Sequence, residues 1–221
     1  MTTKSVLRLR RIYLAAGVLA MLFSGVLYAW SILKVPFKDV FGWSDSALAL
    51  NFTLTMCFFC LGAFFGSLLC KRLRARFTLI LAGILACTGF LLTGFLRADL
   101  LWLLYVGYAI LAGSGIGISY NVVVSTVSAW FPDRKGFCSG CLMMGFGIST
   151  LLLGNILSGL FGAPAFGWRK TFILLGILLG IVLVLAGLIL RRPTADTVLP
   201  AAAVKSLSRK EDFEVRDFST R

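Results

Sequence analysis

Six long apolar segments, separated by short breaks that hold almost all of the charge, constrain this chain more than any other feature of its sequence. A helix needs about 20 apolar residues to cross the hydrocarbon core of a bilayer, and each segment approaches or exceeds that length. The segments are solidly apolar and do not alternate every second residue, which excludes a transmembrane β-barrel. The sequence therefore predicts an all-α membrane protein with transmembrane helices over residues 12–33, 47–69, 77–96, 100–130, 136–162 and 171–190.

Composition and charge agree with this class. The chain is 59% apolar and 14% charged, whereas soluble domains are about 45–50% apolar and about a quarter charged. The net charge of +13 would suggest a nucleic-acid partner in a soluble protein. Here the basic residues lie between apolar segments, where they set topology and contact anionic lipid head groups. We therefore expect membrane lipids as partners and no nucleic acid.

The basic residues are divided unequally between the two sides of the membrane. Twelve flank one side and five the other, and acidic residues offset part of the smaller group. Because Lys and Arg accumulate on the cytoplasmic side, both termini are predicted to be cytoplasmic in a multi-pass protein of the plasma membrane. The twelve are Lys4, Arg8, Arg10, Arg11, Lys71, Arg72, Arg74, Arg76, Arg134, Lys135, Arg191 and Arg192; the five are Lys34, Lys38, Arg97, Arg169 and Lys170.

Three regions follow from the positions of the charges. Residues 1–11 are predicted to form a basic cytoplasmic N-terminus, and residues 12–191 a bundle of six transmembrane helices. Beyond Arg191 the composition changes to prolines, alanines and mixed charges, which is typical of a solvated segment. Residues 192–221 are therefore predicted to be a cytoplasmic linker or tail, corresponding to the start of a central loop.

Side chains suited to catalysis are scarce. The chain has no histidine, and the four acidic residues that precede the tail lie in the breaks, so no carboxylate pair is available inside the membrane. We therefore predict neither an enzyme nor a cofactor. Two pairs, Cys57/Cys60 and Cys138/Cys141, have the spacing of zinc ligands, but they lie on apolar helices at different depths. We interpret them as packing residues and predict no metal site.

Glycines recur at a spacing of four within the segments. The run Gly113-x-Gly115-x-Gly117 has the spacing of part of a nucleotide-binding loop, but it lies inside an apolar helix, without the strand that precedes such a loop. Small residues four apart instead form a helix face that a neighbouring backbone can approach closely. The pairs predicted to do so are Gly62 and Gly66, Gly113 and Gly117, and Gly136 and Gly140.

Polar and aromatic side chains inside the segments are candidate binding residues, because burying polar groups in lipid is costly. Tyr28 shares one helical face with Ser24 and Ser31. The alternative is that the hydroxyls bond their own helix backbone and that Tyr and Trp belong to the interfacial belt. The candidate binding residues are Tyr28, Trp30, Asn51, Thr55, Tyr120 and Asn121.

Several motifs occur at fixed places relative to the segments. They are Tyr28-Ala29-Trp30-Ser31, Phe41-Gly42-Trp43-Ser44, Trp130-Phe131-Pro132-Asp133-Arg134-Lys135-Gly136 and Phe166-Gly167-Trp168-Arg169-Lys170, together with a glycine-rich fourth segment that ends with Tyr120. In this order the chain resembles the amino-terminal half of a major facilitator superfamily transporter. The resemblance is closest to the oxalate/formate antiporter-like branch, near the monocarboxylate porters.

The resemblance implies a fold and a function. The fold is a six-helix bundle of two inverted three-helix repeats, which forms one half of a twelve-span protein. The implied function is secondary active transport of small carboxylates by alternating access, with the six candidates above as substrate-binding residues. The implied partners are a carboxylate anion and a missing carboxy-terminal half or a second copy of the chain. A half-sized protein that dimerises, or a non-transporting assembly or sensing partner, remains the alternative.

One loop departs from the family pattern. Between the second and third spans the superfamily usually has Gly-x-x-x-Asp-Arg-x-Gly-Arg-Arg, whereas this chain has Cys70 at the Asp position and Leu73 at the second Gly position. Every Lys and Arg lies at or beyond the end of a predicted span, so the membrane midplane holds no cation for a carboxylate. This half is therefore expected to supply neutral aromatic and hydrogen-bonding groups, and the other half the cationic ones.

Overall fold

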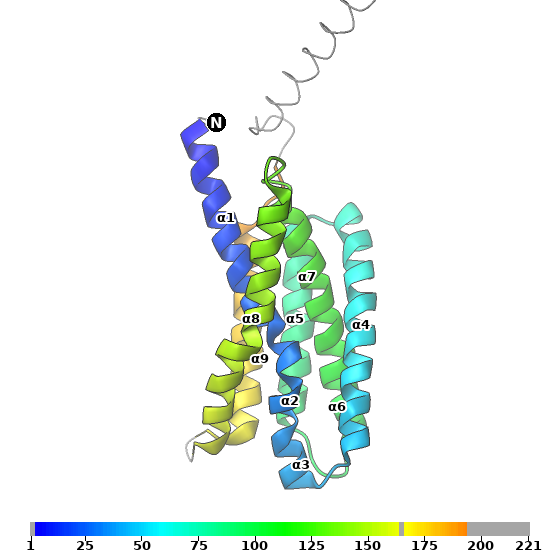
Figure 1. The fold of residues 1–221 in the computed structure, drawn as a ribbon. Coiled ribbons are helices and arrows are strands. Elements are labelled where there is room, and N and C mark those ends of the chain that lie inside the picture. Colours follow the sequence, from blue (N-terminus) through cyan, green and yellow to red (C-terminus); the bar gives the residue numbers. More distant parts are fainter. Residues whose placement is uncertain (1–2, 164–165, 194–221) are drawn as a thin grey trace, which may run out of the picture.

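The computed structural model describes residues 3–163 and 166–193, and throughout this part every regular element is helical. Six helical stretches are long and apolar enough to cross a membrane, which confirms the predicted fold class. In chain order the elements are α1 Thr3–Ser24, η1 Gly25–Ala29, α2 Trp30–Leu33, α3 Val35–Phe41, α4 Asp45–Arg72, α5 Ala75–Gly94, α6 Leu101–Leu104, η2 Tyr105–Ala112, α7 Gly113–Ser128, α8 Lys135–Gly162 and α9 Gly167–Ile189 (Figure 1).

Two of the spans are composite. The first consists of α1, η1, α2 and α3, in which η1 is a 3-10 helix, and the fourth consists of α6, η2 and α7, in which η2 is a π-helix. Gly42, with a φ of 66°, ends the first span, and the Ser44 hydroxyl accepts a hydrogen bond from the Ala47 N–H to begin α4. Short 3-10 and π segments inside membrane helices often mark functional positions.

The first helix is longer than the apolar pattern predicts. It begins at Thr3, so Arg8, Arg10 and Arg11 lie on the same continuous helix as the first apolar segment. Residues 3–11 continue the helix beyond the apolar segment, because a helix that is already nucleated can extend into solvent. The predicted linker or tail falls almost entirely outside the described residues, and the three-region division remains a prediction.

The spans pack in a pattern that repeats between the two halves of the bundle. Extensive contacts join α5 with α9, α4 with α7 and α1 with α8, and α5 also packs closely against α7 and η2 of the fourth span. When the first three spans are matched with the last three, the contact of the second span with the fourth corresponds to that of the fifth with the first. The same matching exchanges the third span with the sixth, so the contact between these two spans is its own counterpart. These three pairs follow the symmetry of two three-helix repeats, whereas the contact of α5 with the fourth span is closer than its counterpart between α9 and α1; Figure 1 shows α4 running beside α7.

Glycines allow the closest contacts between helices, and two of the three predicted glycine pairs lie at such contacts. A Cβ at Gly113 would lie 3.0 Å from the Thr55 carbonyl oxygen of α4, and Gly117 faces the same helix. Gly115, two residues from each, faces α5, because a step of two residues turns an α-helix through about 200°. The third pair, Gly136 and Gly140, is wrong: no heavy atom of the described chain lies within 4 Å of a Cβ there.

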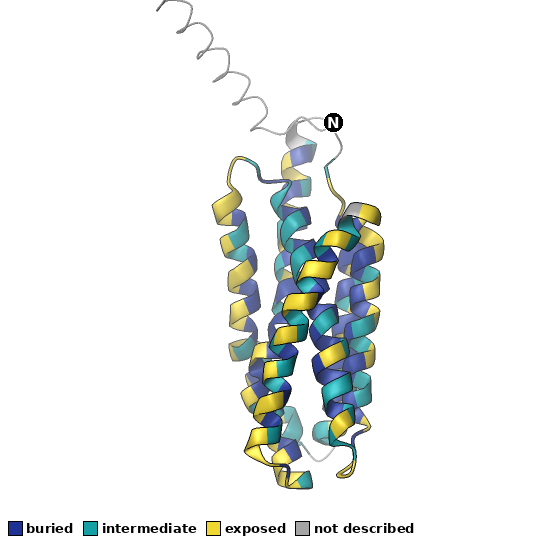
Figure 2. Ribbon diagram, turned by 90° about the vertical axis from the view of Figure 1, so that its right-hand side faces the viewer, coloured by how far each residue is buried: buried dark blue, intermediate teal, exposed yellow. Residues whose placement is uncertain are grey.

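Burial is uneven among the spans (Figure 2). In the most apolar window of each span, 56% of the residues are buried for Leu101–Ser128 but only 17% for Asp45–Cys70. The second span therefore shows most of its surface outside the bundle, as expected for a helix that contacts lipid or another protein unit.

The N-terminal helix, the connection between α7 and α8, and the end of α9 lie together at one end of the bundle. Arg10 forms an ion pair with Asp133 and its guanidinium lies 4.5 Å from the centre of the Phe131 ring. The Trp130 indole Nε1 donates a hydrogen bond to the Arg191 carbonyl oxygen at 2.7 Å. These contacts place three of the basic regions at the same end of the molecule, and the fourth joins them because a Cβ at Gly187 of α9 would lie 3.1 Å from the Arg76 carbonyl oxygen.

Candidate functional site

Four aromatic rings from four different spans meet on one side of the bundle. Phe146 of α8 lies between the others, with ring centres 5.3 Å from Tyr28 of η1, 6.0 Å from Phe59 of α4 and 5.2 Å from Tyr120 of α7. Phe59 and Tyr120 are 5.5 Å apart. Most of these contacts are edge-to-face, the arrangement in which the positive edge of one ring meets the negative face of another. We call these four residues the aromatic cluster.

The aromatic cluster is closed on one side and open on the other. Phe146 is 6% exposed and forms its base, whereas Tyr28 is 48% exposed, and Phe59 and Tyr120 are half-buried. Neither tyrosine hydroxyl has a hydrogen-bond partner among the described residues. Each is therefore free to donate to, or accept from, a group outside the six helices.

The backbone around Gly25 positions the cluster. A Cβ at Gly25 would lie 2.7 Å from the Ser149 Cβ and closer still to the Phe146 carbonyl oxygen, so only glycine allows η1 to contact α8 here. This close contact brings Tyr28, three residues later, to the Phe146 ring. The Ser24 and Ser119 hydroxyl oxygens, 3.4 Å apart, join the first and fourth spans just beside it.

Two of the predicted binding residues, Tyr28 and Tyr120, belong to the aromatic cluster. Asn121 follows Tyr120 directly and is half-buried. Asn51 and Thr55 are completely buried inside the bundle, and the Thr55 hydroxyl donates to the Asn51 carbonyl oxygen at 2.7 Å. The side-chain amide of Asn51 has no hydrogen-bond partner within the described part of the chain.

Trp30 has a different environment from the other candidates. Its indole Nε1 donates to the Leu48 carbonyl oxygen at 2.9 Å, and its ring centre lies 4.6 Å from that of Tyr108. The side chain is 4% exposed. Trp30 thus links the first, second and fourth spans from inside and is not part of the aromatic cluster.

Sequence reasoning missed Phe59 and Phe146. Phe59 could have been found, because Asn51, Thr55 and Phe59 follow one another at a spacing of four and so lie on one helical face. Phe146 has a weaker signal, because Ser149 and Thr150 follow it at a spacing of three and four, but α8 is apolar around most of the rest of its circumference. Only the packing of α8 against η1, α4 and α7 distinguishes this phenylalanine from its neighbours.

The surroundings of the aromatic cluster are uncharged. The ion pairs of the described residues lie at the two ends of the bundle, between Arg10 and Asp133 at one end and between Lys38 and Asp45 at the other. No group of three His, Cys, Asp or Glu residues that could hold a metal ion occurs in the described ranges. The site can therefore offer ring edges, two phenol hydroxyls and an amide to a ligand, but no formal charge.

Comparison with known proteins identifies the family. The profile of the Major Facilitator Superfamily matches residues 12–218. The chain belongs to this superfamily. Its members are transporters and not enzymes, as the sequence predicts.

The relatives of this superfamily member include two kinds of carboxylate carrier. The oxalate:formate antiporter of Oxalobacter formigenes is 31% identical over 185 residues, which are 83% of this chain and 43% of the relative. Monocarboxylate transporter 12 of Homo sapiens is 31% identical over 146 residues, which are 66% of this chain and 28% of the relative. The matched region is the amino-terminal part of these proteins, and the chain spans less than half of their length.

Proposed function

We propose that this chain acts as the amino-terminal half of a secondary active transporter for small carboxylates, with the aromatic cluster as its contribution to the substrate site. The observation that carries the proposal is the aromatic cluster itself. It is an open, uncharged group of rings and phenol hydroxyls drawn from four spans of a protein related to an oxalate:formate antiporter. Substrate sites of this superfamily lie between two six-helix halves near the midplane.

The chemistry of the aromatic cluster suits the neutral part of such a site. A carboxylate is attracted to the positive edges of aromatic rings and accepts hydrogen bonds from the Tyr28 and Tyr120 hydroxyls. Asn121 can add an amide donor beside Tyr120. A carboxylate held only by neutral groups in a low-dielectric site would keep a desolvation penalty of several kcal/mol, on the order of that for any unpaired buried ion. We infer that the compensating cations come from the second half.

Reconstitution tests this division between the halves. The 221-residue chain alone in liposomes should exchange no labelled oxalate, formate or lactate above empty vesicles. The same chain reconstituted with the carboxy-terminal half of the Oxalobacter formigenes antiporter should exchange at least one of them. Saturable uptake by the chain alone would contradict the division, and a cross-linkable but inactive pair would contradict the carboxylate assignment.

Variants of the paired halves test the aromatic cluster. Tyr28→Phe and Tyr120→Phe should each raise the apparent KM about 5- to 30-fold. One hydrogen bond to a charged group contributes about 1.5–3 kcal/mol, and a water molecule that bonds the carboxylate in place of the lost hydroxyl recovers part of this energy. Phe59→Ala should weaken binding as well, whereas Phe64→Ala, on the same helix and 60% exposed, is the matched control. An unchanged KM in both tyrosine variants would remove them from the site.

The orientation in the plasma membrane is part of the same proposal. The positive-inside rule places both termini in the cytoplasm, and the contacts among α1, the α7–α8 connection and the end of α9 support a common side for the basic breaks. In a chain that lacks the native cysteines, a cysteine at Ser44 should react with an impermeant reagent added outside intact cells. A cysteine at Ser206, which lies outside the described residues, should not. The opposite pattern would contradict the proposed topology.

A further inference from the structure

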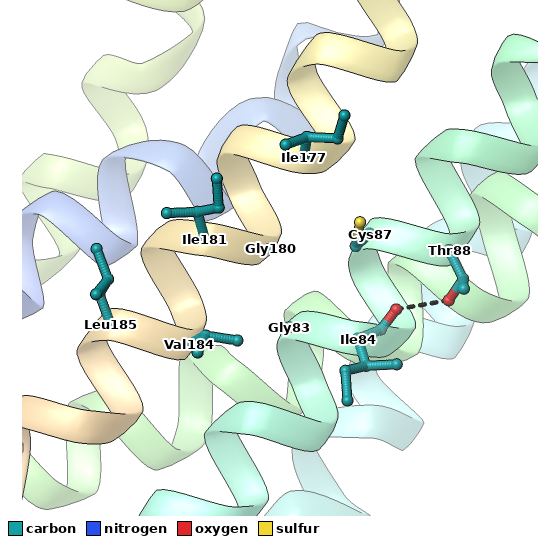
Figure 3. Close-up of a pocket in the computed structure, with 9 residues that line it drawn as sticks. All are labelled: Gly83, Ile84, Cys87, Thr88, Ile177, Gly180, Ile181, Val184 and Leu185. Carbon is teal, nitrogen blue, oxygen red and sulfur yellow. Dashed lines mark hydrogen bonds between the residues drawn. The ribbon is translucent and has the colours of Figure 1, made fainter.

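A groove of about 390 Å³ lies between α5 and α9, and all of its lining residues belong to these two helices (Figure 3). Its floor is formed where Gly83 and Gly180 bring the two helices together, and a Cβ at Gly180 would lie 3.0 Å from the Cys87 Cβ. Ile84 of α5 and Ile181 of α9 form opposite rims and are 53% and 50% exposed. The groove is therefore a permanent consequence of glycine packing between large exposed side chains.

The lining indicates the chemistry of an occupant. Apart from the Cys87 thiol and the Thr88 hydroxyl, the side chains that line the groove are aliphatic. The Thr88 hydroxyl donates to the Ile84 carbonyl oxygen of its own helix at 2.6 Å, as Figure 3 shows. No lining side chain in this groove is left with an unmet hydrogen bond, so a polar ligand would lose its hydration without compensation. An apolar chain fits, and a polar molecule does not.

The depth of the groove matches one leaflet of a bilayer. The start of α5 and the end of α9 lie together, because a Cβ at Gly187 would be 3.1 Å from the Arg76 carbonyl oxygen. At 1.5 Å per residue, Leu185 lies about 6 Å from the end of α9, and Thr88 about 20 Å from the start of α5. The groove thus runs along roughly half of the ~30 Å hydrocarbon core, next to the end that carries the basic breaks.

Four arginines at the end of the groove indicate that its occupant carries a negatively charged head group. Arg74 and Arg76 at the start of α5, and Arg191 and Arg192 just after α9, are all exposed. None of the four forms an ion pair with another residue of the described ranges. Arginine binds phosphate oxygens through a planar fork of donors, and basic residues at the end of membrane helices attract anionic lipids.

We propose that this groove is a binding site for one anionic phospholipid, one of whose acyl chains lies between α5 and α9 and whose phosphate is held by Arg76, Arg191 and Arg192. The apolar lining sets the position of the chain, and the arginines set the preference for a negative head group. This site is independent of the transported substrate and of the aromatic cluster, so its test does not depend on the transport proposal.

Native mass spectrometry of the full chain tests the proposal. The delipidated protein is titrated with phosphatidylglycerol and with phosphatidylcholine of identical acyl chains. One phosphatidylglycerol should be retained with at least 10-fold higher affinity than phosphatidylcholine. The triple variant Arg76→Gln, Arg191→Gln, Arg192→Gln should remove that preference. Arg97→Gln with Arg169→Gln, two basic residues at the opposite end of the bundle, is the matched control and should retain it.

The groove itself is tested separately from the arginines. Ile181→Trp and Ile84→Trp place an indole at either rim, and each should lower phosphatidylglycerol retention about 10-fold. Leu178→Trp is the control, because Leu178 is exposed on α9 but does not line the groove. Equal retention of the two lipids by the unmodified chain would overturn the proposal. So would unchanged retention in the arginine variant, or equal loss in Leu178→Trp, provided that each variant keeps the circular dichroism spectrum of the parent chain.

Discussion

Substituting alanine for Gly115 should destabilise the bundle by about 2 kcal/mol, although alanine is the better helix former. A Cβ at this position would lie 2.7 Å from the Ala82 carbonyl oxygen and 2.7 Å from the Ala86 backbone nitrogen of α5. Both are backbone atoms, so α5 and α7 must separate by roughly 0.7 Å or more. A gap of that size forfeits about a quarter to a half of each dispersion contact, and overpacking costs about 1–3 kcal/mol.

The gain in helix propensity offsets part of that cost. Alanine is favoured over glycine inside a helix by about 1 kcal/mol, which leaves a net loss of about 2 kcal/mol when the packing cost is near its upper value. For a protein of this size that loss corresponds to a fall of about 4–8 °C in Tm. Thermal unfolding of the purified chain in detergent, followed by circular dichroism, measures the shift.

Gly147→Ala provides the matched control on α8. No heavy atom of the described chain lies within 4 Å of a Cβ at Gly147, and the residue is exposed, so only the gain in propensity applies. Its Tm should stay the same or rise by a few degrees. The reasoning is refuted if Gly115→Ala melts at the temperature of the parent chain, or if the two variants fall by the same amount.

Three further substitutions test individual contacts by the same measurement. Asp133→Asn should lower the free energy of unfolding by about 2 kcal/mol, because it leaves the nearly buried guanidinium of Arg10 without its carboxylate. An unchanged Tm would show that the Arg10–Asp133 ion pair does not stabilise the bundle. Trp30→Phe should cost about 1 kcal/mol through the lost hydrogen bond to Leu48, and no loss would contradict a packing role. Asn51→Leu should raise the Tm, since it removes a buried amide without a protein partner; a fall would indicate that the amide is satisfied in the membrane.

Secondary structure and span number could be predicted from the sequence because the signal is one-dimensional. Each crossing helix requires its own run of about 20 apolar residues, and charges are confined to the ends of those runs. The observed spans Ala75–Gly94 and Lys135–Gly162 differ from the predicted 77–96 and 136–162 by two residues or fewer at any end. The start of the first helix was less predictable, because polar residues can continue a helix beyond the lipid.

Site residues were only partly predictable, because being polar inside a span does not say which way a side chain faces. Tyr28 and Trp30 are two residues apart on the first span, yet Tyr28 is about half exposed in the aromatic cluster and Trp30 is buried against Tyr108. Residues two apart on a helix point in nearly opposite directions, and the choice between them depends on which neighbour each face meets.

The sequence by itself determined that the chain is a six-span helical bundle with its charge at the ends, since the cost of placing unpaired polar backbone and charge in lipid leaves no other solution. Which faces of those helices meet was decided only by the tertiary structure. Gly113, Gly115 and Gly117 look alike in the sequence, but two face α4 and one faces α5, and Gly136 and Gly140 face no neighbour in the described chain. The aromatic cluster arises from the same choice, because polar residues mark a face on some of its four spans, but only packing decides which of those faces meet.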